Sequence, residues 1–359
     1  MVICKQNIMS NFYPGPSQLY PEIGAYLQEA FVSGILEMNH RSEAFMKLDA
    51  ETKELLHNRL NIPANYQIVF TSSATECWEI ISQSFIEKSS LHFYNGAFGE
   101  KWFQYAKKIH SETQGLQFSE EGIPDIKDIS GQQELLAFTH NETSNGTALP
   151  FAFQQDVRKQ FPHQLIAYDA TSSMAGYALK WELGDIWYAS VQKCFGLPPG
   201  MAIMVVSPEA VARARELKDE RYYNSFNYML ANAEKHQTHH TPNITNIFLL
   251  NRVLKKRQNI QEIHNQLTGR KQSFYQMIDH FPQLKGHISE SKFQSDTVFC
   301  IDVTPELLND LKSAAYKEGI IMGSGYGALK QSTFRIANFP AIQQDDFNRL
   351  GNFLNQFFK

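Results

Sequence analysis

The sequence predicts an α/β fold, with a large domain built on a mainly parallel mixed sheet sandwiched by helices and a smaller α+β C-terminal domain. Between residues 20 and about 206, short apolar runs alternate with helical patterns. Those runs have almost no polar face, which is typical of strands buried on both sides. After residue 207 helical patterns dominate and only two strand-like runs remain, which indicates a second unit.

The elements can be placed in chain order. Strands are expected at 67–71, 91–95, 135–140, 165–170, 186–193 and 201–206. Helical periodicity covers residues 45–60 and 97–110, and then 208–218 and 244–280, with a Tyr/Asn/His-rich irregular stretch before residue 242. Strands at 297–303 and 332–338 and helices at 305–317 and 341–357 complete the smaller unit. We therefore expect an N-terminal arm at 1–20, a large domain at 21–250 and a small domain at 251–359.

Composition narrows the classes of function. The chain has 359 residues, a net charge of −4 and 43% hydrophobic residues, which is enough for about two packed domains. This balance disfavours nucleic acid or an anionic membrane as a partner. The four cysteines form no CxxC pair, so we expect neither a disulfide framework nor a zinc site, and a cytoplasmic location is the default. Aromatic residues make up 13% of the chain and favour a large core, an aromatic pocket or both.

Two charged residues stand where apolar strands end. Lys193 follows the run IWYASVQ, and Asp169 follows LIAY. A buried lysine can be kept partly neutral, as a Schiff-base lysine requires, and an aspartate can hold a protonated pyridine nitrogen. Taken alone, Lys193 also fits an edge-strand lysine that reaches water, and Asp169 fits a helix cap.

Three further segments have polar groups at strand ends or inside a strand. Residues 71–75 lead from a strand into a helix, where backbone N–H groups can bind a phosphate, although ordinary capping uses the same residues. The cluster HNETSNG at 140–146 follows another strand. Arg335 lies within the apolar run STFRIANF and suits a carboxylate, or a structural ion pair. Together these groups fit one ligand, pyridoxal 5′-phosphate.

Several motifs resemble the class V aminotransferases of the fold type I, aspartate-aminotransferase-like group, and among them the phosphoserine aminotransferases. The resemblance covers nearly the whole chain. It rests on the segments NFYPGPSQLYPEI, EMNHRSEAF, LNIPANYQIVF, HNETSNG, SVQKCFGLPPG, HHTPNIT and FRIANFP. Of these, the Gln-Lys pair at 192–193 together with HNETSNG is the most specific.

The resemblance implies a role for each matching position. Lys193 would carry pyridoxal phosphate as a Schiff base and later act as the base at the substrate α-carbon. Asp169 would pair with the pyridine nitrogen, Thr143 with the ring hydroxyl, and Phe98 would stack on the ring. The cofactor phosphate would be held by Ala74, Thr75 and Gln192 and, from the second subunit of a homodimer, by His240 and Thr241. Arg335 would bind the substrate carboxylate.

Departures from the family pattern concern the substrate. Thr75 stands where the family has an arginine, and His240 where it has an asparagine. The family's His-Arg pair before the carboxylate arginine is replaced by Ala328 and Leu329, so His40, Arg41 and Lys330 are the remaining candidates for a substrate phosphate. We expect phosphoserine:2-oxoglutarate transamination, as in serine biosynthesis. The alternative is an unphosphorylated alanine or serine with glyoxylate or pyruvate.

Three other functions fit the residues less well. A cysteine desulfurase needs a thiol on a mobile loop, whereas Cys300 lies in the apolar run VFCID. A catalytically idle binding protein has no need of Lys193, Asp169 and Arg335 together. Metal binding by His236, His239 and His240 is disfavoured because Pro242 indicates a loop. The sequence therefore predicts a transaminase without a metal.

Overall fold

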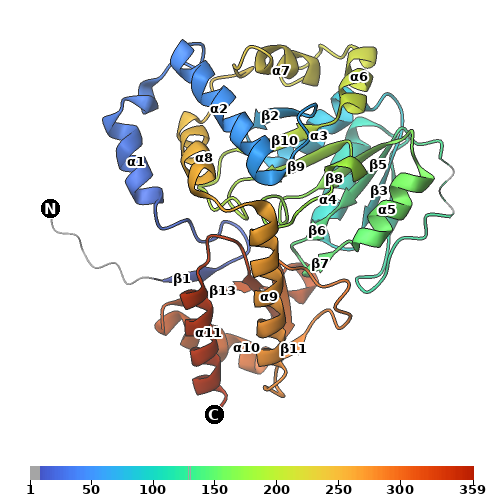
Figure 1. Cartoon of the computed structure of the whole chain (residues 1–359). Helices are drawn as coiled ribbons and strands as arrows, with labels where there is room; N and C mark the ends of the chain where they lie inside the picture. The colour runs from blue at the N-terminus through green and yellow to red at the C-terminus, as the bar shows by residue number, and fades with distance from the viewer. Residues whose placement is uncertain (1–8, 128, 130) are drawn as a thin grey trace.

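The computed structural model describes residues 9–127, 129 and 131–359, and its elements are arranged around two main sheets (Figure 1). The larger sheet has the strand order β2-β10-β9-β8-β5-β3-β4. Strand β10 is antiparallel to β2 and β9, and the other neighbours are parallel. The mainly parallel mixed sheet that the sequence predicts is confirmed. Its strands are β2 (Gln67–Thr71), β3 (Ser90–Tyr94), β4 (Gln114–Gln117), β5 (Leu135–Thr139), β8 (Leu165–Asp169), β9 (Ile186–Ser190) and β10 (Ala202–Val206).

Helices cover both faces of this sheet, and successive strand residues belong to different cores. In β9, Ile186 and Tyr188 lie in one apolar cluster, whereas Trp187 and Ala189 lie in the other. Because side chains of a strand alternate between faces, a strand buried on both faces is expected to be largely apolar. The helices are α1 (Ile23–Val32), α2 (Glu43–Leu60), α3 (Ala74–Phe85), α4 (Ala97–Ile109), α5 (Phe151–Gln160), α6 (Pro208–Leu217), α7 (Phe226–Ala233) and α8 (Ile244–Lys256), with short turns η1 (Ile35–Glu37) and η2 (Trp181–Leu183).

A row of stacked rings crosses four neighbouring strands of the large sheet. Phe93 of β3 stacks on Phe138 of β5 with 4.6 Å between ring centroids. Phe138 stacks on Tyr168 of β8 at 5.7 Å, and Tyr168 on Trp187 of β9 at 4.3 Å. Stacked aromatic pairs contribute about 0.5–1.5 kcal/mol each beyond their buried area. Part of the high aromatic content therefore stabilises the sheet.

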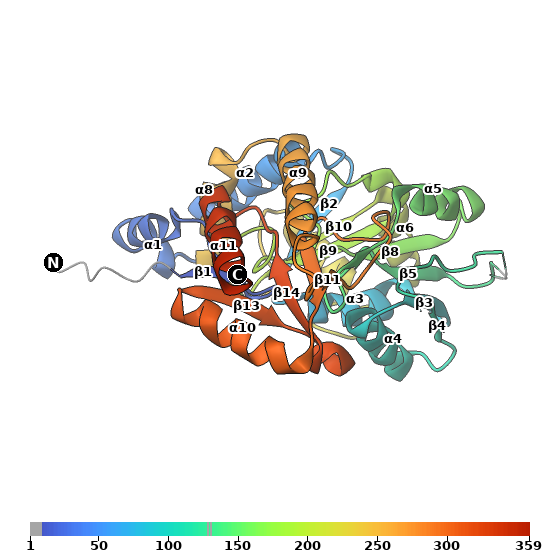
Figure 2. The same ribbon diagram turned by 90° about the horizontal axis from the view of Figure 1, so that it is seen from below.

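The smaller sheet has the order β1-β13-β14-β12-β11 and includes part of the N-terminal segment. Residues 10–12 pair in parallel with residues 320–322, so the expected arm contributes an edge strand to the small sheet, while residues 1–8 lie outside the described part. Figure 2 shows helices packed around this sheet. The elements are β1 (Ser10–Phe12), β11 (Lys285–Gly286), β12 (Val298–Asp302), β13 (Ile320–Ser324), β14 (Thr333–Ala337), α9 (Ile260–Ile278), α10 (Pro305–Lys317), α11 (Gln344–Phe357) and the turn η3 (Gly327–Gln331).

Two expectations about helices are wrong. The single helix expected at 244–280 is two helices, because Arg257 is extended and the Asn259 side chain caps the second one by accepting from the backbone N–H of Gln261 at 2.7 Å. The stretch before residue 242 is not irregular throughout, since it contains α7. Its Phe226 and Met229 pack into the core on the α3 side of the large sheet.

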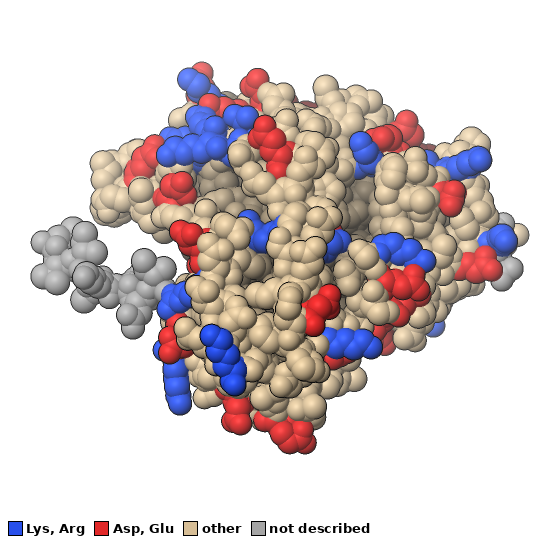
Figure 3. All heavy atoms as spheres, turned by 60° about the horizontal axis from the view of Figure 1, so that its bottom comes forward, with Lys and Arg blue, Asp and Glu red and all other residues tan. Residues whose placement is uncertain are grey.

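Charged side chains of both signs are interspersed over the face seen in Figure 3, in keeping with the net charge of −4. None of the helices in the described part of the chain is long and apolar enough to cross a membrane.

Candidate active site

A cavity of about 630 Å³ lies at the carboxyl ends of the central strands. Strands β5, β8 and β9 run parallel and end at Thr139, Asp169 and Ser190, so their last residues meet at one edge of the sheet. Open α/β sheets bind ligands at this edge. Eight residues singled out from the sequence line the cavity: Ala74, Thr75, Phe98, Thr143, Asp169, Gln192, Lys193 and Arg335.

Lys193 is buried at the cavity wall, with 7% of its surface exposed. Its Nζ donates to Thr143 Oγ1 at 2.8 Å and to Ser172 Oγ at 3.0 Å. Burial lowers the pKa of the lysine to about 8, because the nearby Asp169 and Glu142 carboxylates only partly offset the desolvation of the ammonium. With this pKa about a tenth of the molecules carry a neutral Lys193 amine at pH 7, far more than at the ordinary pKa of 10.5, and the neutral amine is the nucleophile.

Asp169 is held in a fixed orientation on the same wall. Its Oδ1 accepts from the backbone N–H of Thr171 at 2.9 Å, and Tyr188 bonds to its carboxyl group. Trp78 in turn donates from Nε1 to the Tyr188 hydroxyl at 2.7 Å. Burial raises the pKa of Asp169 above its ordinary value, against the effect of these bonds and of Lys193. A cationic ligand group beside Asp169 would therefore be strongly favoured.

The amino end of α3 faces the cavity. Ser73 caps the helix by accepting from the backbone N–H of Glu76 at 3.1 Å. The backbone N–H of Ala74 donates to Ser190 Oγ at 3.1 Å, which ties this turn to the end of β9. Thr75 is exposed beside it. The partial positive charge of a helix N-terminus and a hydroxyl suit a phosphate at this point.

Phe98 lies beside the lysine, in the first turn of α4. Its ring centroid is 5.3 Å from Lys193 Nζ and 5.2 Å from the ring centroid of Tyr326. The buried Glu142 carboxylate accepts from the backbone N–H groups of Phe98 and Gly99, both at 3.1 Å. Glu142 therefore fixes the start of the helix that carries Phe98.

Arg335 reaches the cavity from β14 of the small sheet, with only 3% of its surface exposed. Its Nε donates to the carbonyl oxygen of Ser324 at 2.8 Å, and Nη1 donates to the carbonyl oxygen of Thr143 at 2.7 Å. These bonds hold the planar guanidinium between the two sheets, where it suits a carboxylate.

Two polar atoms of the cavity wall, Thr139 Oγ1 and Asn141 Nδ2, are buried and have no hydrogen-bond partner in the described part of the chain. Leaving such atoms unsatisfied costs about 1–3 kcal/mol each, so a polar ligand is expected to contact them. The amine, the carboxylate and the helix N-terminus match the aldehyde, the ring nitrogen and the phosphate of pyridoxal phosphate, so the residues present fit this group.

Comparison with known proteins assigns the family. The family model for aminotransferase class V matches residues 11–340. The chain belongs to the class V aminotransferases. A crystal structure of a phosphoserine aminotransferase from Cytophaga hutchinsonii is 29% identical, with a TM-score of 0.93, and the match covers 99% of this chain and 100% of that one. Phosphoserine aminotransferase of Rhodococcus opacus is 25% identical over 94% of this chain and 91% of its own length.

Proteins of lower sequence identity share the fold of this chain. A structure of alanine–glyoxylate aminotransferase from Nostoc sp. has a TM-score of 0.81 at 17% identity, covering 100% of this chain and 98% of that one. This class V aminotransferase is thus a transaminase with the fold of the pyridoxal-phosphate group.

Sequence reasoning missed several residues of the cavity. Tyr13 and Gly15 come from the N-terminal segment, and a Cβ on Gly15 would lie 2.9 Å from Lys193 Cε. Ser172 bonds to Lys193 and follows Asp169 by three residues, so the run DATSS already contained it. Lys101 donates from Nζ to the Tyr326 hydroxyl at 2.6 Å at the cavity wall. In the sequence, nothing distinguishes Lys101 from the other lysines of α4.

Five predicted residues do not line the cavity of their own chain: His40, Arg41, Lys330, His240 and Thr241. Arg41 donates from Nη1 to Gln237 Oε1 at 3.0 Å, and His40 lies close enough to Arg41 and His240 for their charges, after burial, to lower its pKa. Lys330 is exposed in η3, where its charge adds to the burial that lowers the pKa of Lys312. A role of His40, Arg41 and Lys330 in substrate binding therefore stays a prediction.

The histidines near residue 240 do not form a cluster of three. His236 Nδ1 lies 3.5 Å from Asp49 Oδ2, whereas His239 Nε2 lies 3.2 Å from His240 Nδ1. Within residues 9–127, 129 and 131–359, no group of three or more His, Cys, Asp or Glu side chains is placed to hold a metal ion.

Proposed function

We propose that this chain uses pyridoxal 5′-phosphate to transfer the amino group between phosphoserine and 2-oxoglutarate. The observation that carries the proposal is the buried Lys193, which shares one cavity with Asp169 and Arg335. The cofactor, when bound, supplies an electron sink for the bond that breaks at the substrate α-carbon. The remaining chemistry consists of binding, orientation and proton transfer by side chains.

Each side chain has one task in this proposal. Lys193 moves the proton at the substrate α-carbon, and the Thr143 and Ser172 hydroxyls orient its Nζ. Asp169 keeps the ring nitrogen protonated, because a buried carboxylate gains most from a cationic partner. Arg335 binds the substrate carboxylate and so aligns the α-carbon with the lysine.

The cofactor phosphate is proposed to bind at the start of α3. Ala74, Thr75 and Gln192 line this end of the cavity. Backbone N–H groups and a hydroxyl neutralise less charge than the arginine that Thr75 replaces. His240 and Thr241 of the partner subunit are proposed to complete the site.

Lys101 supports a phosphorylated substrate. It lines the same cavity as Arg335, and its Nζ lies 5.1 Å from the Tyr326 ring centroid. Lys108 lines the cavity as well. These lysines supply positive charge that the family's His-Arg pair, replaced here by Ala328 and Leu329, no longer provides, so a dianionic phosphate would be compensated by ammonium groups.

A homodimer is proposed from an exposed apolar surface on the N-terminal helices. Phe31 is 72% exposed and Val32 is 74% exposed, and Leu36 follows in η1 at 44%. Such a patch marks an interaction site, and a second copy of the same chain is the commonest partner. The group of His40, Arg41 and His240 would then serve the cavity of the partner subunit.

Dilution should release cofactor as the dimer dissociates, and a monomer with full cofactor affinity would contradict the assignment of these residues to the partner's cavity.

The cofactor can be tested first and the substrate second. Protein supplied with pyridoxal phosphate should become yellow and keep a reduced adduct after borohydride treatment, whereas Lys193→Ala should form no adduct. Absence of an adduct in the unmodified chain would refute the proposal. Transamination rates on phosphoserine, serine and alanine then identify the donor.

One observation favours a second substrate class. Ala328 is exposed and Leu329 is partly buried, and neither lines the cavity. An unphosphorylated alanine or serine, with glyoxylate or pyruvate as acceptor, would not need the missing His-Arg pair. Faster turnover of alanine than of phosphoserine would establish that alternative.

A further inference from the structure

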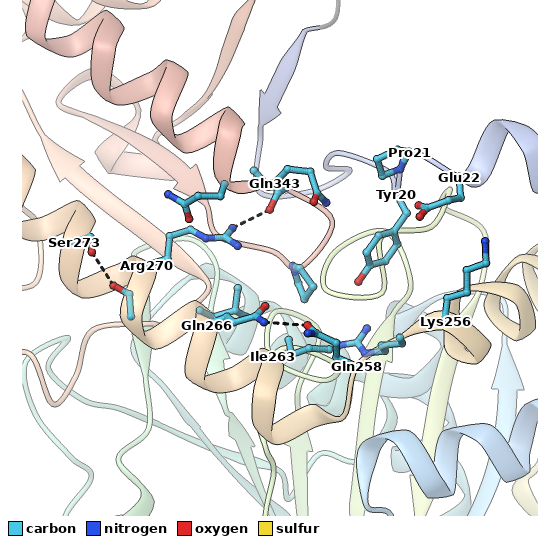
Figure 4. A pocket seen from close by; sticks show the side chains of 16 residues that line it. Tyr20, Pro21, Glu22, Lys256, Gln258, Ile263, Gln266, Arg270, Ser273 and Gln343 are labelled. Carbon is cyan, nitrogen blue, oxygen red and sulfur yellow. Dashed lines mark hydrogen bonds between the residues drawn. The ribbon is translucent and has the colours of Figure 1, made fainter.

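A second cavity of about 580 Å³ lies between the large and small domains and shares no lining residue with the cavity around Lys193. Figure 4 shows that Tyr20, Pro21 and Glu22 approach it from one side and Gln266, Arg270 and Ser273 of α9 from the other. Its volume is within the range of about 300–1,000 Å³ that is usual for small-molecule sites.

The side chains around this cavity carry a surplus of positive charge. Lys256, Arg257 and Arg270 face it, and Glu22 is the one acidic residue among its described lining. Burial lowers the pKa of Arg270 to about 10, against the opposing charge of Asp346. An anion in the cavity would relieve this cost. Neutral hydrogen-bonding groups complete the wall: Gln258, Gln266, Gln343, Gln344 and Ser273.

Arg257 is the buried member of this group, with 6% of its surface exposed. Its Nη2 donates to the carbonyl oxygen of Ala175. Its Nε and Nη1 are buried and have no hydrogen-bond partner, and no carboxylate forms an ion pair with it, among the residues the structure describes. A buried guanidinium without a counter-charge is costly, and its planar donors match the oxygens of a phosphate or carboxylate.

Residues that line the second cavity contact two segments next to Lys193: the turn at Gly196 and the loop that contains Ser172. Tyr20 lines it and packs on Gly196, where a Cβ would lie 2.7 Å from the Tyr20 ring. The backbone N–H of Gly196 donates to the carbonyl oxygen of Lys193 at 2.9 Å. Arg257 bonds to Ala175, which is in the same loop after β8 as Ser172, a direct partner of Lys193.

We propose that this interdomain cavity is a second binding site, for a small polar molecule with several anionic oxygens, and that its occupancy alters the environment of Lys193. Arg257 and Arg270 bind the anionic group, and the glutamines bind the polar remainder. The site is distinct from the substrate pocket and does not depend on the substrate proposed above. A phosphate ester and a di- or tricarboxylate share the required chemistry.

Binding can be measured by calorimetry on the cofactor-loaded enzyme with pyrophosphate and, separately, citrate as probes. We expect one equivalent of at least one probe to bind, and comparing the two distinguishes phosphate from carboxylate ligands. Arg257→Gln should weaken binding about tenfold or more, because it removes a charged hydrogen-bond donor. The Arg335→Gln variant should still bind the probe, which separates this site from the substrate pocket.

Two neighbouring lysines give a matched comparison. Lys256 lines the cavity and is exposed, whereas Lys255 is exposed and pairs with Glu51 at 2.8 Å. Lys256→Gln should weaken binding several-fold, and Lys255→Gln, with the same loss of charge, should not. Comparing these two lysine variants tests whether the probe binds in the second cavity, even if Arg257→Gln fails to fold. Absence of binding, or equal binding in all variants, would overturn the site.

The connection to Lys193 has its own measurement. Saturation with the probe should move the pH midpoint of the cofactor's visible absorption in the unmodified enzyme, and should not move it in Arg257→Gln. If the midpoint does not move although the probe binds, the connection to Lys193 is disproved, but the binding site itself is not. Failure to bind pyridoxal phosphate would instead refute the proposed function, while calorimetry on the protein alone would still test the cavity.

Discussion

The proposed cofactor end and the proposed substrate end of the main cavity are assembled in different ways. At the cofactor end, Asp169 and Ser190 end parallel strands of one sheet, and Lys193 follows three residues later. At the substrate end, Arg335 comes from the small sheet, and Lys101 of α4 contacts Tyr326, which precedes η3. One end is fixed by strand register within a sheet, and the other depends on how the two sheets sit against each other.

This difference predicts that substrate recognition responds to changes at the domain boundary while cofactor binding does not. Arg335→Gln should raise KM for the amino acid about a hundredfold, since it removes a charged, two-pronged contact with the carboxylate. Cofactor absorption should remain. Arg335→Lys keeps the charge but loses the planar donors, so it should recover only part of the loss. Equal KM values for the three proteins would place the carboxylate elsewhere.

At the cofactor end, the largest expected effect on stability comes from Lys193. Its pKa of about 8 in the folded chain lies below its ordinary value of 10.5, because of burial. Between these two pH values the unfolded state binds more protons, so the stability of the cofactor-free chain rises with pH. Below about pH 8, Lys193→Met should therefore raise the free energy of unfolding by about 3 kcal/mol.

That gain should shrink as the pH rises from about 8 to 10.5 and vanish above it. Urea denaturation at pH 7 and pH 10.5 measures both values. Lys47→Met is a matched control, because Lys47 is exposed on α2 and its replacement should change stability little at either pH. A destabilised Lys193→Met at pH 7 would contradict the lowered pKa.

The cofactor end could be predicted from the sequence for a physical reason. In a doubly buried strand such as β8 nearly every side chain is apolar, so the polar residue at its carboxyl end, Asp169, marks the edge where ligands bind. Arg335 stood out in the same way, as a charge inside an apolar run. Its partner carbonyls could not be predicted, because that of Ser324 depends on the pairing of β14 with β13 and that of Thr143 on how the small sheet sits against the large one.

The other elements and residues that the sequence did not predict also depend on contacts between distant segments. Strand β4 (Gln114–Gln117) has a mostly polar sequence at the edge of the large sheet, so no apolar run indicates it. The three residues of β1 are a strand only because β13 pairs with them. Lys101 looks like a solvent-exposed helix lysine until Tyr326 is placed beside it. Contacts between segments distant in the chain leave little trace in local patterns.

Replacing Lys101 should have a smaller effect on substrate recognition than replacing Arg335. Lys101→Gln should lower kcat/KM for phosphoserine about tenfold and leave the value for alanine unchanged, because one charge contact to the phosphate is lost. Lys107→Gln is the control: Lys107 is on the same helix, is exposed and does not line the cavity. Equal losses on both substrates would show that Lys101 acts on the cofactor or on folding instead.

The smallest expected effect concerns an ion pair between the two domains. His287 bonds from Nδ1 to Asp302 Oδ1 at 2.8 Å, near the end of β12, and from Nε2 to Glu120 Oε2 at 3.0 Å, in the loop after β4. These bonds raise the pKa of His287 to about 10, from an ordinary value of 6.5. Because the pKa is raised on folding, the protonated histidine stabilises the fold fully below about pH 6.5, and this contribution is lost as the pH rises through about 10. Both carboxylates are partly exposed, so solvent screening reduces the contribution to about 1–2 kcal/mol.

His287→Gln should therefore lower the melting temperature at pH 6 and match the unmodified protein above about pH 10. Replacement of the exposed His163 by Gln is the control and should leave the melting temperature unchanged at both pH values. If the deficit of His287→Gln were the same at both pH values, the histidine would stabilise the fold by packing rather than by charge.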